Sequence, residues 1–118
     1  MASLNKLQFT FTRNLNKLLT VCFSSGFEVT MGEVFRTELQ QQVYFKLCKT
    51  KTLDSYHLKR LAVDLHLFKD NIFLSENSAY EFLAEYWGKL DPRNFAGYYW
   101  GWDAMHFEMR EYERSDRR

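Results

Sequence analysis

The chain has 118 residues, of which 46% are hydrophobic and 18% aromatic, with one proline and five glycines. This composition is typical of globular proteins and the length suits one compact domain, which excludes a disordered chain and a pair of ordinary domains. Sixteen basic and fifteen acidic residues leave a net charge of +1, which argues against nucleic-acid binding and against electrostatic attraction to membranes. We therefore predict a single domain over residues 1–118.

The N-terminal segment predicts a long helix. Apolar residues recur at helical spacing from Leu4 to Cys22, and the "SSG" that follows is typical of a glycine cap. The segment lacks the uninterrupted apolar core and the small-residue cleavage site of a signal peptide, and no run approaches the length of a membrane span. We expect synthesis in the cytosol without membrane insertion, so that any export requires a partner.

The middle of the chain alternates between strand and helix patterns. Residues 27–31 alternate as a strand does, and residues 37–49 return to helical spacing. Two further strands are predicted at 61–68 and 71–74, with "KDN" as the hairpin turn between them. Ser78 and Glu81 form a capping-box pair that opens another helix. The residues of this helix predicted to face inward are Tyr80, Phe82, Leu83, Tyr86, Trp87 and Leu90.

The last third is predicted to be an aromatic-rich loop followed by a short strand. The loop is "DPRNFAGYYWGWDA" (91–104), and the strand is "MHFEMRE" (105–111). The aromatic residues expected to divide between the core and a cleft wall are Tyr98, Tyr99, Trp100 and Trp102. The end of the chain, "REYERSDRR" (110–118), is predicted to be a solvated, frayed tail. Helices and strands mix without β–α–β regularity, so the fold class is α+β, a small antiparallel sheet with flanking helices.

The chain contains two cysteines, Cys22 and Cys48, and both lie in apolar helical patterns. Neither has the short spacing to another cysteine that redox motifs and zinc knuckles require. We therefore predict two buried free thiols rather than a disulfide.

Ionisable side chains interrupt the apolar strand predicted at 61–68. Its two-residue period places Leu61, Val63, Leu65 and Leu67 on one face, which we predict to be core. The other face carries Asp64 and His66, and His57 precedes Asp64 by seven residues. In the final strand the same period places His106 and Glu108 on a common face, and Asp103 lies three residues before His106. Burying such a group without a partner costs on the order of several kcal/mol, so we expect these groups to serve a function.

Two imidazoles and a carboxylate are a chemically suitable ligand set for zinc, because they leave a fourth position for water as catalytic sites require. A second carboxylate nearby can then take a proton from that water. Each of these residues alone is weak evidence for a metal site, since a single histidine in a strand more often forms structural hydrogen bonds than binds a metal. The order and context of the pieces are more specific.

Two motifs resemble those of the VanY-like zinc peptidases. "SYHLKRLAVD" (55–64) matches Ser-x-His-x(6)-Asp with alanine two residues before the aspartate, and "WDAMHFE" (102–108) matches Trp-Asp-x-x-His-Phe-Glu. "GEVFRTELQQQVY" (32–44) is similar to that family's Arg-Thr…Gln helix start, so the resemblance runs from about Phe27 to Glu108. The family contains D-Ala-D-Ala carboxypeptidases and phage L-alanyl-D-glutamate endopeptidases. It implies the LAS/hedgehog-like zinc peptidase fold.

The resemblance implies a role for each residue at a matching position. The implied zinc ligands are His57, Asp64 and His106. Asp103 would be the general base and acid, and Ser55 would support the ligands without touching the metal. Arg36 would neutralise a carboxylate or oxyanion of the substrate, and its plain alternative is a surface residue at a helix start.

Other positions leave alternatives open. The family has glycine where this chain has Arg60, so the arginine either changes the turn there or faces the substrate itself. His66 shares the predicted face of Asp64, and a hydrogen-bonding neighbour is favoured over an alternative ligand. Glu108 either orients His106, as the partners of ligand histidines do, or is exposed on the surface.

The expected function is that of a zinc metallopeptidase that hydrolyses peptidoglycan stem peptides. The chain most resembles a bacteriophage endolysin of the L-alanyl-D-glutamate endopeptidase type, without a separate cell-wall-binding domain. Such a monomer would stay in the host cytoplasm until a holin-type pore gave it access to the cell wall for host lysis, or would be part of a virion. The alternatives are a D,D-carboxypeptidase or dipeptidase acting on D-Ala-D-Ala and, in another class, a non-catalytic phage structural or wall-binding module.

Overall fold

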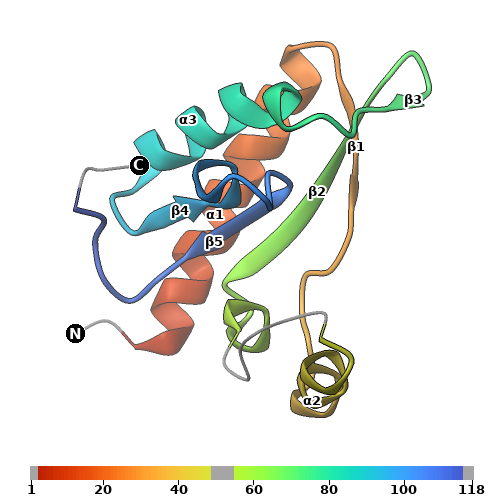
Figure 1. Cartoon of the computed structure of the whole chain (residues 1–118). Coiled ribbons are helices and arrows are strands. Elements are labelled where there is room, and N and C mark those ends of the chain that lie inside the picture. Colours follow the sequence, from red (N-terminus) through yellow and green to blue (C-terminus); the bar gives the residue numbers. More distant parts are fainter. Residues whose placement is uncertain (1–2, 49–54, 116–118) are drawn as a thin grey trace.

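A computed structural model of the chain describes residues 3–48 and 55–115, in which five strands form one antiparallel sheet (Figure 1). The strands are β1 (Glu28–Met31), β2 (Ala62–Lys69), β3 (Ile72–Phe73), β4 (Asn94–Ala96) and β5 (His106–Met109). Their order is β1-β2-β5-β4, and β3 pairs with the end of β2. The predicted α+β class is confirmed, and β2 is the strand that joins the two halves of the sheet.

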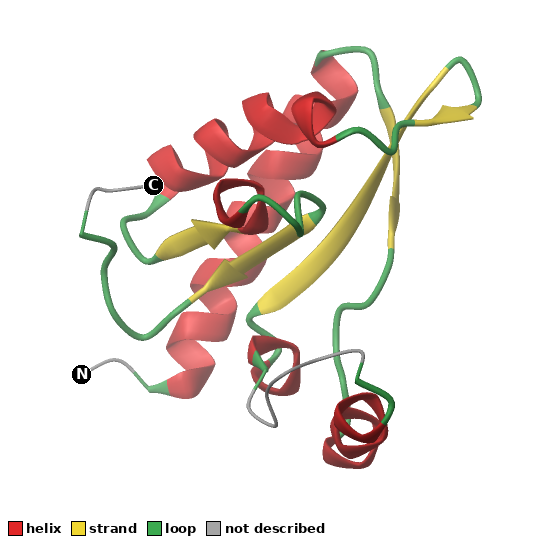
Figure 2. Ribbon diagram, viewed as in Figure 1, coloured by secondary structure: helices red, strands yellow, loops and turns green. Residues whose placement is uncertain are grey.

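Two helices, α1 (Leu4–Ser24) and α3 (Glu81–Leu90), lie side by side against one face of this sheet (Figure 2). A third, α2 (Glu38–Lys46), stands apart from that layer (Figure 1). Three short 3-10 turns complete the described elements: η1 (Tyr56–Lys59), η2 (Asn77–Tyr80) and η3 (Gly97–Trp100). No helix among the described residues is long and apolar enough to cross a membrane. The sheet therefore has one covered face and one face on which a site can open to solvent.

The first helix begins and ends as its sequence predicts. The Ser3 hydroxyl accepts a hydrogen bond from the Lys6 backbone N–H, which caps the start of the helix. At the other end, Gly26 has a φ of 88°, and the backbone N–H of Phe27 donates to the Cys22 carbonyl at 3.0 Å. This is a Schellman motif, for which glycine is favoured because its left-handed conformation carries no Cβ clash.

The core lies between the two packed helices and the inner face of β2. The predicted inward residues of this segment are all inaccessible to solvent: Leu61, Val63, Leu65 and Leu67. They pack with Trp87, Tyr80 and Phe107 in one cluster, and burying each aliphatic side chain contributes roughly 1.5–3 kcal/mol. This strong inward preference fixes the register of β2, and the register fixes which residues face outward.

The hairpin predicted after β2 is present. Asp70 and Asn71 both adopt left-handed backbone conformations, with φ of 53° and 65°. Phe68 pairs with Phe73 across the turn. Two consecutive positive φ angles characterise the two-residue type I′ turn, which matches the twist of the flanking strands.

Two local predictions near α3 and β4 are wrong. The N-cap of α3 is Tyr80 and makes no side-chain cap bond, because Ser78 belongs to η2, the turn that precedes the helix. The predicted capping box between Ser78 and Glu81 is therefore absent. The segment predicted as an aromatic loop contains β4 and η3, since β4 pairs antiparallel with β5.

The predictions for the second cysteine and for the C-terminal tail also need correction. Cys22 is a buried free thiol as expected, but Cys48 is free and exposed, because it follows α2, whose only buried residue is Gln41. Residues 116–118 of the predicted tail lie outside the described residues. Within the described part, Arg114 donates hydrogen bonds to the backbone carbonyls of Gly88, Asp91 and Asn94. Residues 111–113 and 115 are exposed as predicted, but Arg114 binds the segment to the domain, so the prediction of a frayed tail is wrong for it.

Candidate metal centre

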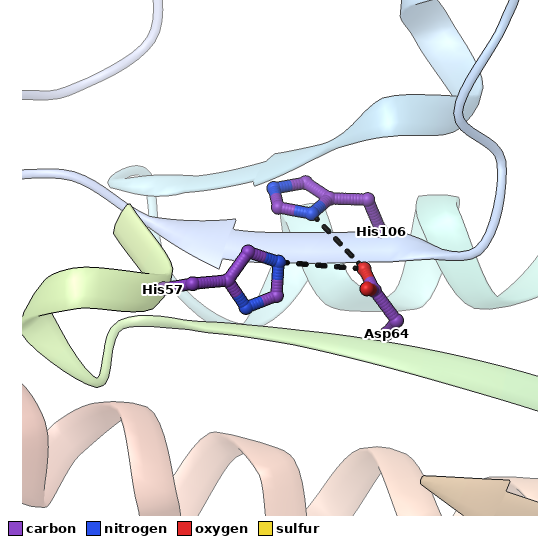
Figure 3. Close-up of side chains that lie close together, drawn as sticks. All are labelled: His57, Asp64 and His106. Carbon is purple, nitrogen blue, oxygen red and sulfur yellow. Dashed lines mark hydrogen bonds and ion pairs between the residues drawn. The ribbon is translucent and has the colours of Figure 1, made fainter. Parts of the chain in front are cut away.

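Strand pairing brings two of the predicted ligands, Asp64 and His106, together. In the antiparallel ladder between β2 and β5, Asp64 lies directly opposite His106, and directly opposed residues carry their side chains on the same face. Nδ1 of His106 lies 3.2 Å from Oδ1 of Asp64. Both side chains point away from α1, toward the uncovered face of the sheet (Figure 3).

The third predicted ligand, His57, comes from the turn η1 at the start of β2. The hydroxyl of Ser55 accepts a hydrogen bond from the His57 backbone N–H, and the His57 carbonyl accepts one from the Arg36 N–H at 3.1 Å. Nε2 of His57 lies 3.6 Å from Asp64 Oδ1 (Figure 3). Ser55 therefore shapes the turn that aims His57 at the aspartate.

Arginine is accommodated at position 60 within the same turn. Arg60 has a φ of 57° and a ψ of 37°, the left-handed conformation in which glycine is favoured. Its guanidinium carbon lies 4.4 Å from the centre of the Phe35 ring, a cation–π contact worth roughly 0.5–1 kcal/mol at an exposed site. The left-handed turn after His57 therefore forms despite the arginine.

The two separations between Asp64 and the histidines are close to those of a tetrahedral zinc site. The ligand atoms of His57, Asp64 and His106 all lie within 4.8 Å of one another. Two ligands that are each about 2.0–2.1 Å from a tetrahedral zinc are about 3.4 Å apart, and the separations of 3.2 and 3.6 Å around Asp64 lie on either side of that value. The two histidines are buried, whereas the Asp64 side chain is 28% exposed. The group can hold a metal ion and leaves a path to it from solvent.

Glu108 holds the second nitrogen of His106. Oε1 of Glu108 lies 2.6 Å from His106 Nε2, which as an N–H donates to it, and the Arg110 guanidinium donates to the other carboxylate oxygen. Glu108 is only 4% exposed, so the surface alternative for this residue is wrong. When His106 is neutral, a carboxylate that accepts the Nε2–H hydrogen bond leaves the Nδ1 lone pair facing Asp64, which is the tautomer a metal requires.

Charge pairing outweighs burial in the site. Burial lowers the pKa of His106, but hydrogen bonds with Asp64 and Glu108 more than compensate and raise it to about 9. Burial raises the pKa of Asp64, yet hydrogen bonds and charge from His106 and His57 hold that pKa well below its usual range. The Asp64 carboxylate is therefore ionised, as a metal ligand must be.

Asp103 differs from these carboxylates in its electrostatics. Its Oδ2 lies 4.0 Å from His106 Nδ1. Burial and the negative charge of Asp64 raise the pKa of Asp103, against the lowering effect of the histidines. A carboxylate with a raised pKa beside a candidate metal site is suited to exchange protons.

A glycine sets the position of the Asp103 loop. A Cβ added to Gly97 would lie 2.0 Å from the Asp103 carbonyl oxygen, so these two backbone segments are in direct contact. The same carbonyl accepts a hydrogen bond from the His106 N–H at 3.1 Å. The contact at Gly97 thus sets the place of a candidate base and a candidate ligand together.

Arg36 lies on the His57 side of the group and is partly buried. It donates to Glu33, donates to Gln41 Oε1 at 2.6 Å, and lies over the Tyr44 ring at 4.8 Å. Glu33 was not predicted to belong to the site, but its Oε1 lies 3.9 Å from His57 Nδ1. Glu33 lies in the segment between β1 and α2, where no helical spacing relates it to Arg36, so no pattern in the sequence indicated it.

His66 and Trp100 complete the surroundings. The ring of His66 packs against the Phe73 ring, 5.8 Å between centres, and lies close to Gly32. The structure thus gathers Asp64 and not His66 with the other two ligand candidates. The Trp100 ring lies 5.4 Å from the His106 ring. Trp100 is one of the four aromatic residues expected from the sequence to divide between the core and a cleft wall, but the sequence pattern does not assign it to either.

No protein-family model matches the chain, and no curated protein matches it. Among solved structures, the L-Ala D-Glu endopeptidase ChiX of Serratia marcescens is similar, with a TM-score of 0.67 and 19% sequence identity. The similarity covers 83% of this chain and 79% of the endopeptidase. At this level of identity the comparison establishes the architecture alone. The chain shares the α+β fold of a peptidase, with a group of two histidines and an aspartate on the open face of its sheet.

Proposed function

We propose that this protein is a zinc-dependent peptidase that cleaves peptidoglycan stem peptides, at the bond between L-Ala and D-Glu. The observation that supports it most directly is the group of His57, Asp64 and His106, with Asp103 beside it. The fold shared with an L-Ala D-Glu endopeptidase supports the choice of bond. The resemblance to phage endopeptidases extends the proposal to host lysis, in which a monomer reaches the wall through a holin-type pore.

The ligand set fits zinc better than the harder divalent cations, since imidazole nitrogen suits zinc whereas magnesium and calcium prefer oxygen alone. Zinc bound there would supply Lewis acidity and lower the pKa of a water molecule toward neutrality. Glu108 would keep His106 in the binding tautomer through the 2.6 Å hydrogen bond. Arg110, which donates to Glu108, would keep that carboxylate in place.

Proton transfer in this proposal belongs to Asp103. As a carboxylate it would accept the proton of the attacking water, and as a carboxylic acid it would return that proton to the leaving amine of D-Glu. Its raised pKa brings the two states closer in free energy than those of an ordinary aspartate. The peptide bond between L-Ala and D-Glu is thereby exchanged for a carboxylate and a free amine.

Arg36 would bind an anionic group of the substrate. A guanidinium has five N–H donors, and the contacts with Glu33 and Gln41 leave further donors on its terminal nitrogens. Packing against Tyr44 fixes the plane of the guanidinium, which favours two-point binding of a carboxylate. The α-carboxylate of D-Glu is such a group.

Digestion of purified muropeptides by the zinc-loaded protein tests the proposal. Mass spectrometry should find products with a new N-terminal D-Glu. Loss of terminal D-Ala instead would identify a D,D-carboxypeptidase, and no cleavage by a zinc-loaded, folded protein would leave the non-catalytic module. The ligand assignment is tested by metal content: His57→Ala and His106→Ala should lose zinc, while His66→Ala should keep it.

Asp103→Asn separates a catalytic role from a structural one. Asparagine keeps the shape of the side chain but cannot take a proton, so the variant should fold and bind zinc normally. Its turnover should fall by roughly 10²–10⁴-fold, the usual contribution of general acid–base catalysis. If Asp103 only forms a turn, asparagine is an equally good substitute. Normal turnover by this variant would therefore leave the mechanism without its base.

A further inference from the structure

Two tryptophans lead outward from the candidate metal centre. Trp102 has 75% of its surface exposed, more than any other large apolar side chain of the described residues. Its ring centre lies 5.9 Å from that of Trp100, with 34° between the ring planes, and the Trp100 ring lies 5.4 Å from that of His106. We call Trp100 and Trp102 the tryptophan pair.

The backbone around the tryptophan pair presents the second indole to solvent. Gly101, between the two residues, has a φ of 87° and nothing within 4 Å of the place where a Cβ would be. The carbonyl of Gly101 accepts a hydrogen bond from the Asn77 side chain, and the guanidinium of Arg110 lies 5.6 Å from the centre of the Trp100 ring. A left-handed glycine thus turns the chain so that Trp102 stays outside the core. A large exposed aromatic surface beside a candidate active site marks a place where a partner binds.

We propose that the tryptophan pair binds a sugar ring of the peptidoglycan glycan strand, namely the N-acetylmuramyl residue that carries the stem peptide. This inference rests on the proposed function. A pyranose has an apolar face of C–H groups and a rim of hydroxyls, so it can pack on an exposed indole while its hydroxyls stay in water. Neither tryptophan carries a charge, so neither offers an ion pair to a carboxylate of the substrate.

The distance from the metal centre fits the position of this sugar in the substrate. L-Ala is the first residue of the stem peptide, and a lactyl group joins it to the sugar. One residue and one lactyl unit extend for about 7 Å at roughly 3.3–3.6 Å each. The Trp100 ring centre lies 5.4 Å from that of His106, and the Trp102 ring centre lies 5.9 Å from that of Trp100, so both rings are near enough to meet a sugar at that distance. A D-Ala–D-Ala bond would place the sugar about 17 Å away, at five such units, beyond the tryptophan pair.

The two ends of the substrate would then lie on different sides of the metal centre. The tryptophan pair lies at the end of η3, which contains Trp100 and packs against α3 and β5, on the side of His106. The Arg36 backbone N–H donates to the His57 carbonyl in η1, and η1 packs against the start of β2. The sugar and L-Ala would therefore occupy the His106 side, and D-Glu the side of Arg36. This order gives both the tryptophan pair and Arg36 a partner in the same substrate.

Matched substrates test the inference. One is N-acetylmuramyl pentapeptide and the other is the same pentapeptide with an N-acetyl group in place of the sugar and lactyl unit. Trp102→Ala should lower kcat/KM for the first by about tenfold, the loss expected for one aromatic contact, and leave the second unchanged. Trp102→Tyr should restore most of the loss. Phe9→Ala, which removes a 61% exposed aromatic from α1, is the control and should change neither. An equal loss on both substrates, or none on either, would overturn the inference.

Binding to the metal-free protein separates this inference from the proposed function. N-acetylmuramyl-L-Ala should shift the indole N–H signal of Trp102 in an NMR titration, and N-acetyl-L-Ala should not. If the zinc-loaded protein cleaves no muropeptide yet this shift is seen, the proposed function is wrong and the sugar site stands. If the sugar-free peptide is cleaved as well as the sugar-linked one and no shift occurs, the sugar site is wrong and the proposed function stands.

Discussion

Replacing Gly97 with alanine should disable the protein through a steric effect on the Asp103 loop. The added Cβ would lie 2.0 Å from the Asp103 carbonyl oxygen, and real Cβ atoms essentially never come within 3.0 Å of another atom. Because the obstacle is backbone, the loop must move by at least the difference, 3.0 − 2.0 = 1.0 Å. The Asp103 carbonyl also accepts the N–H of His106, so the displacement reaches a candidate ligand as well.

The expected size of the effect follows from that displacement. Overpacking costs about 1–3 kcal/mol of unfolding free energy, and a 1 Å misplacement of a catalytic group costs roughly 10²-fold in rate. Urea denaturation measures the first quantity, and kcat/KM on purified muropeptide measures the second. Gly26→Ala is the matched control: with a φ of 88° and open space around it, it should lose about 1–2 kcal/mol of stability through backbone strain but keep its turnover. A Gly97→Ala protein with the stability and turnover of the wild type would refute the reasoning.

Three further predictions concern metal affinity, thiol reactivity and acid stability. Glu108→Ala should weaken zinc binding by roughly 10–100-fold in a competition titration, whereas Glu111→Ala, which removes a more exposed carboxylate paired with a lysine, should not; equal affinities would remove Glu108 from the site. A thiol reagent should label Cys48 in the native protein and spare Cys22, which is fully buried with its pKa raised by burial to about 11; two fast-reacting thiols would contradict the burial. Burial raises the pKa of Asp91, but hydrogen bonds from the guanidinium and the backbone N–H of Arg93 more than offset this effect, so the pKa is lower than usual. The stability that Asp91 contributes is present above its unfolded pKa of about 3.9 and is lost as the pH falls through the lower folded value. The difference in unfolding free energy between the wild type and Asp91→Asn should therefore shrink below about pH 4. A difference that stays constant with pH would refute the ionic origin of this stability.

Local patterns predicted those parts of the structure that local physics determines. The alternation from Leu61 to Phe68 predicted both the strand and its buried face, because a two-residue period has only two ways to meet a core. The hairpin followed from Asp70 and Asn71, which tolerate the left-handed conformation that the turn requires. Periodicity alone did not bring His106 to Asp64, since their pairing spans 42 residues. The motif resemblance supplied that pairing as an expectation.

Other features depend on tertiary contacts that leave no periodic signal. The strand β4 has only three residues and exists because β5 lies beside it. Ser78 had the spacing of a helix cap, but a 3-10 turn moves the start of α3 past it. The sequence around Arg114 is typical of a solvated tail, and the three backbone carbonyls that bind its guanidinium are brought near it only by the tertiary fold. Glu33 approaches His57 only after β1 and η1 have both docked beside β2.

The position of β5 between β2 and β4 gives the two histidines unequal resistance to local unfolding. To expose the β5 backbone, both ladders must break together, along with the hydrogen bond from the Trp87 indole to the Glu108 carbonyl. Amide hydrogens around His106 should therefore exchange only when the whole domain opens. His57 lies in a single 3-10 turn outside the sheet, held by the Ser55 cap, a backbone hydrogen bond from Arg36, and side-chain contacts with Gln8 and Glu111 rather than by strand ladders. Its amide should exchange far sooner, so brief openings of the site begin at η1 while the β5 side remains formed.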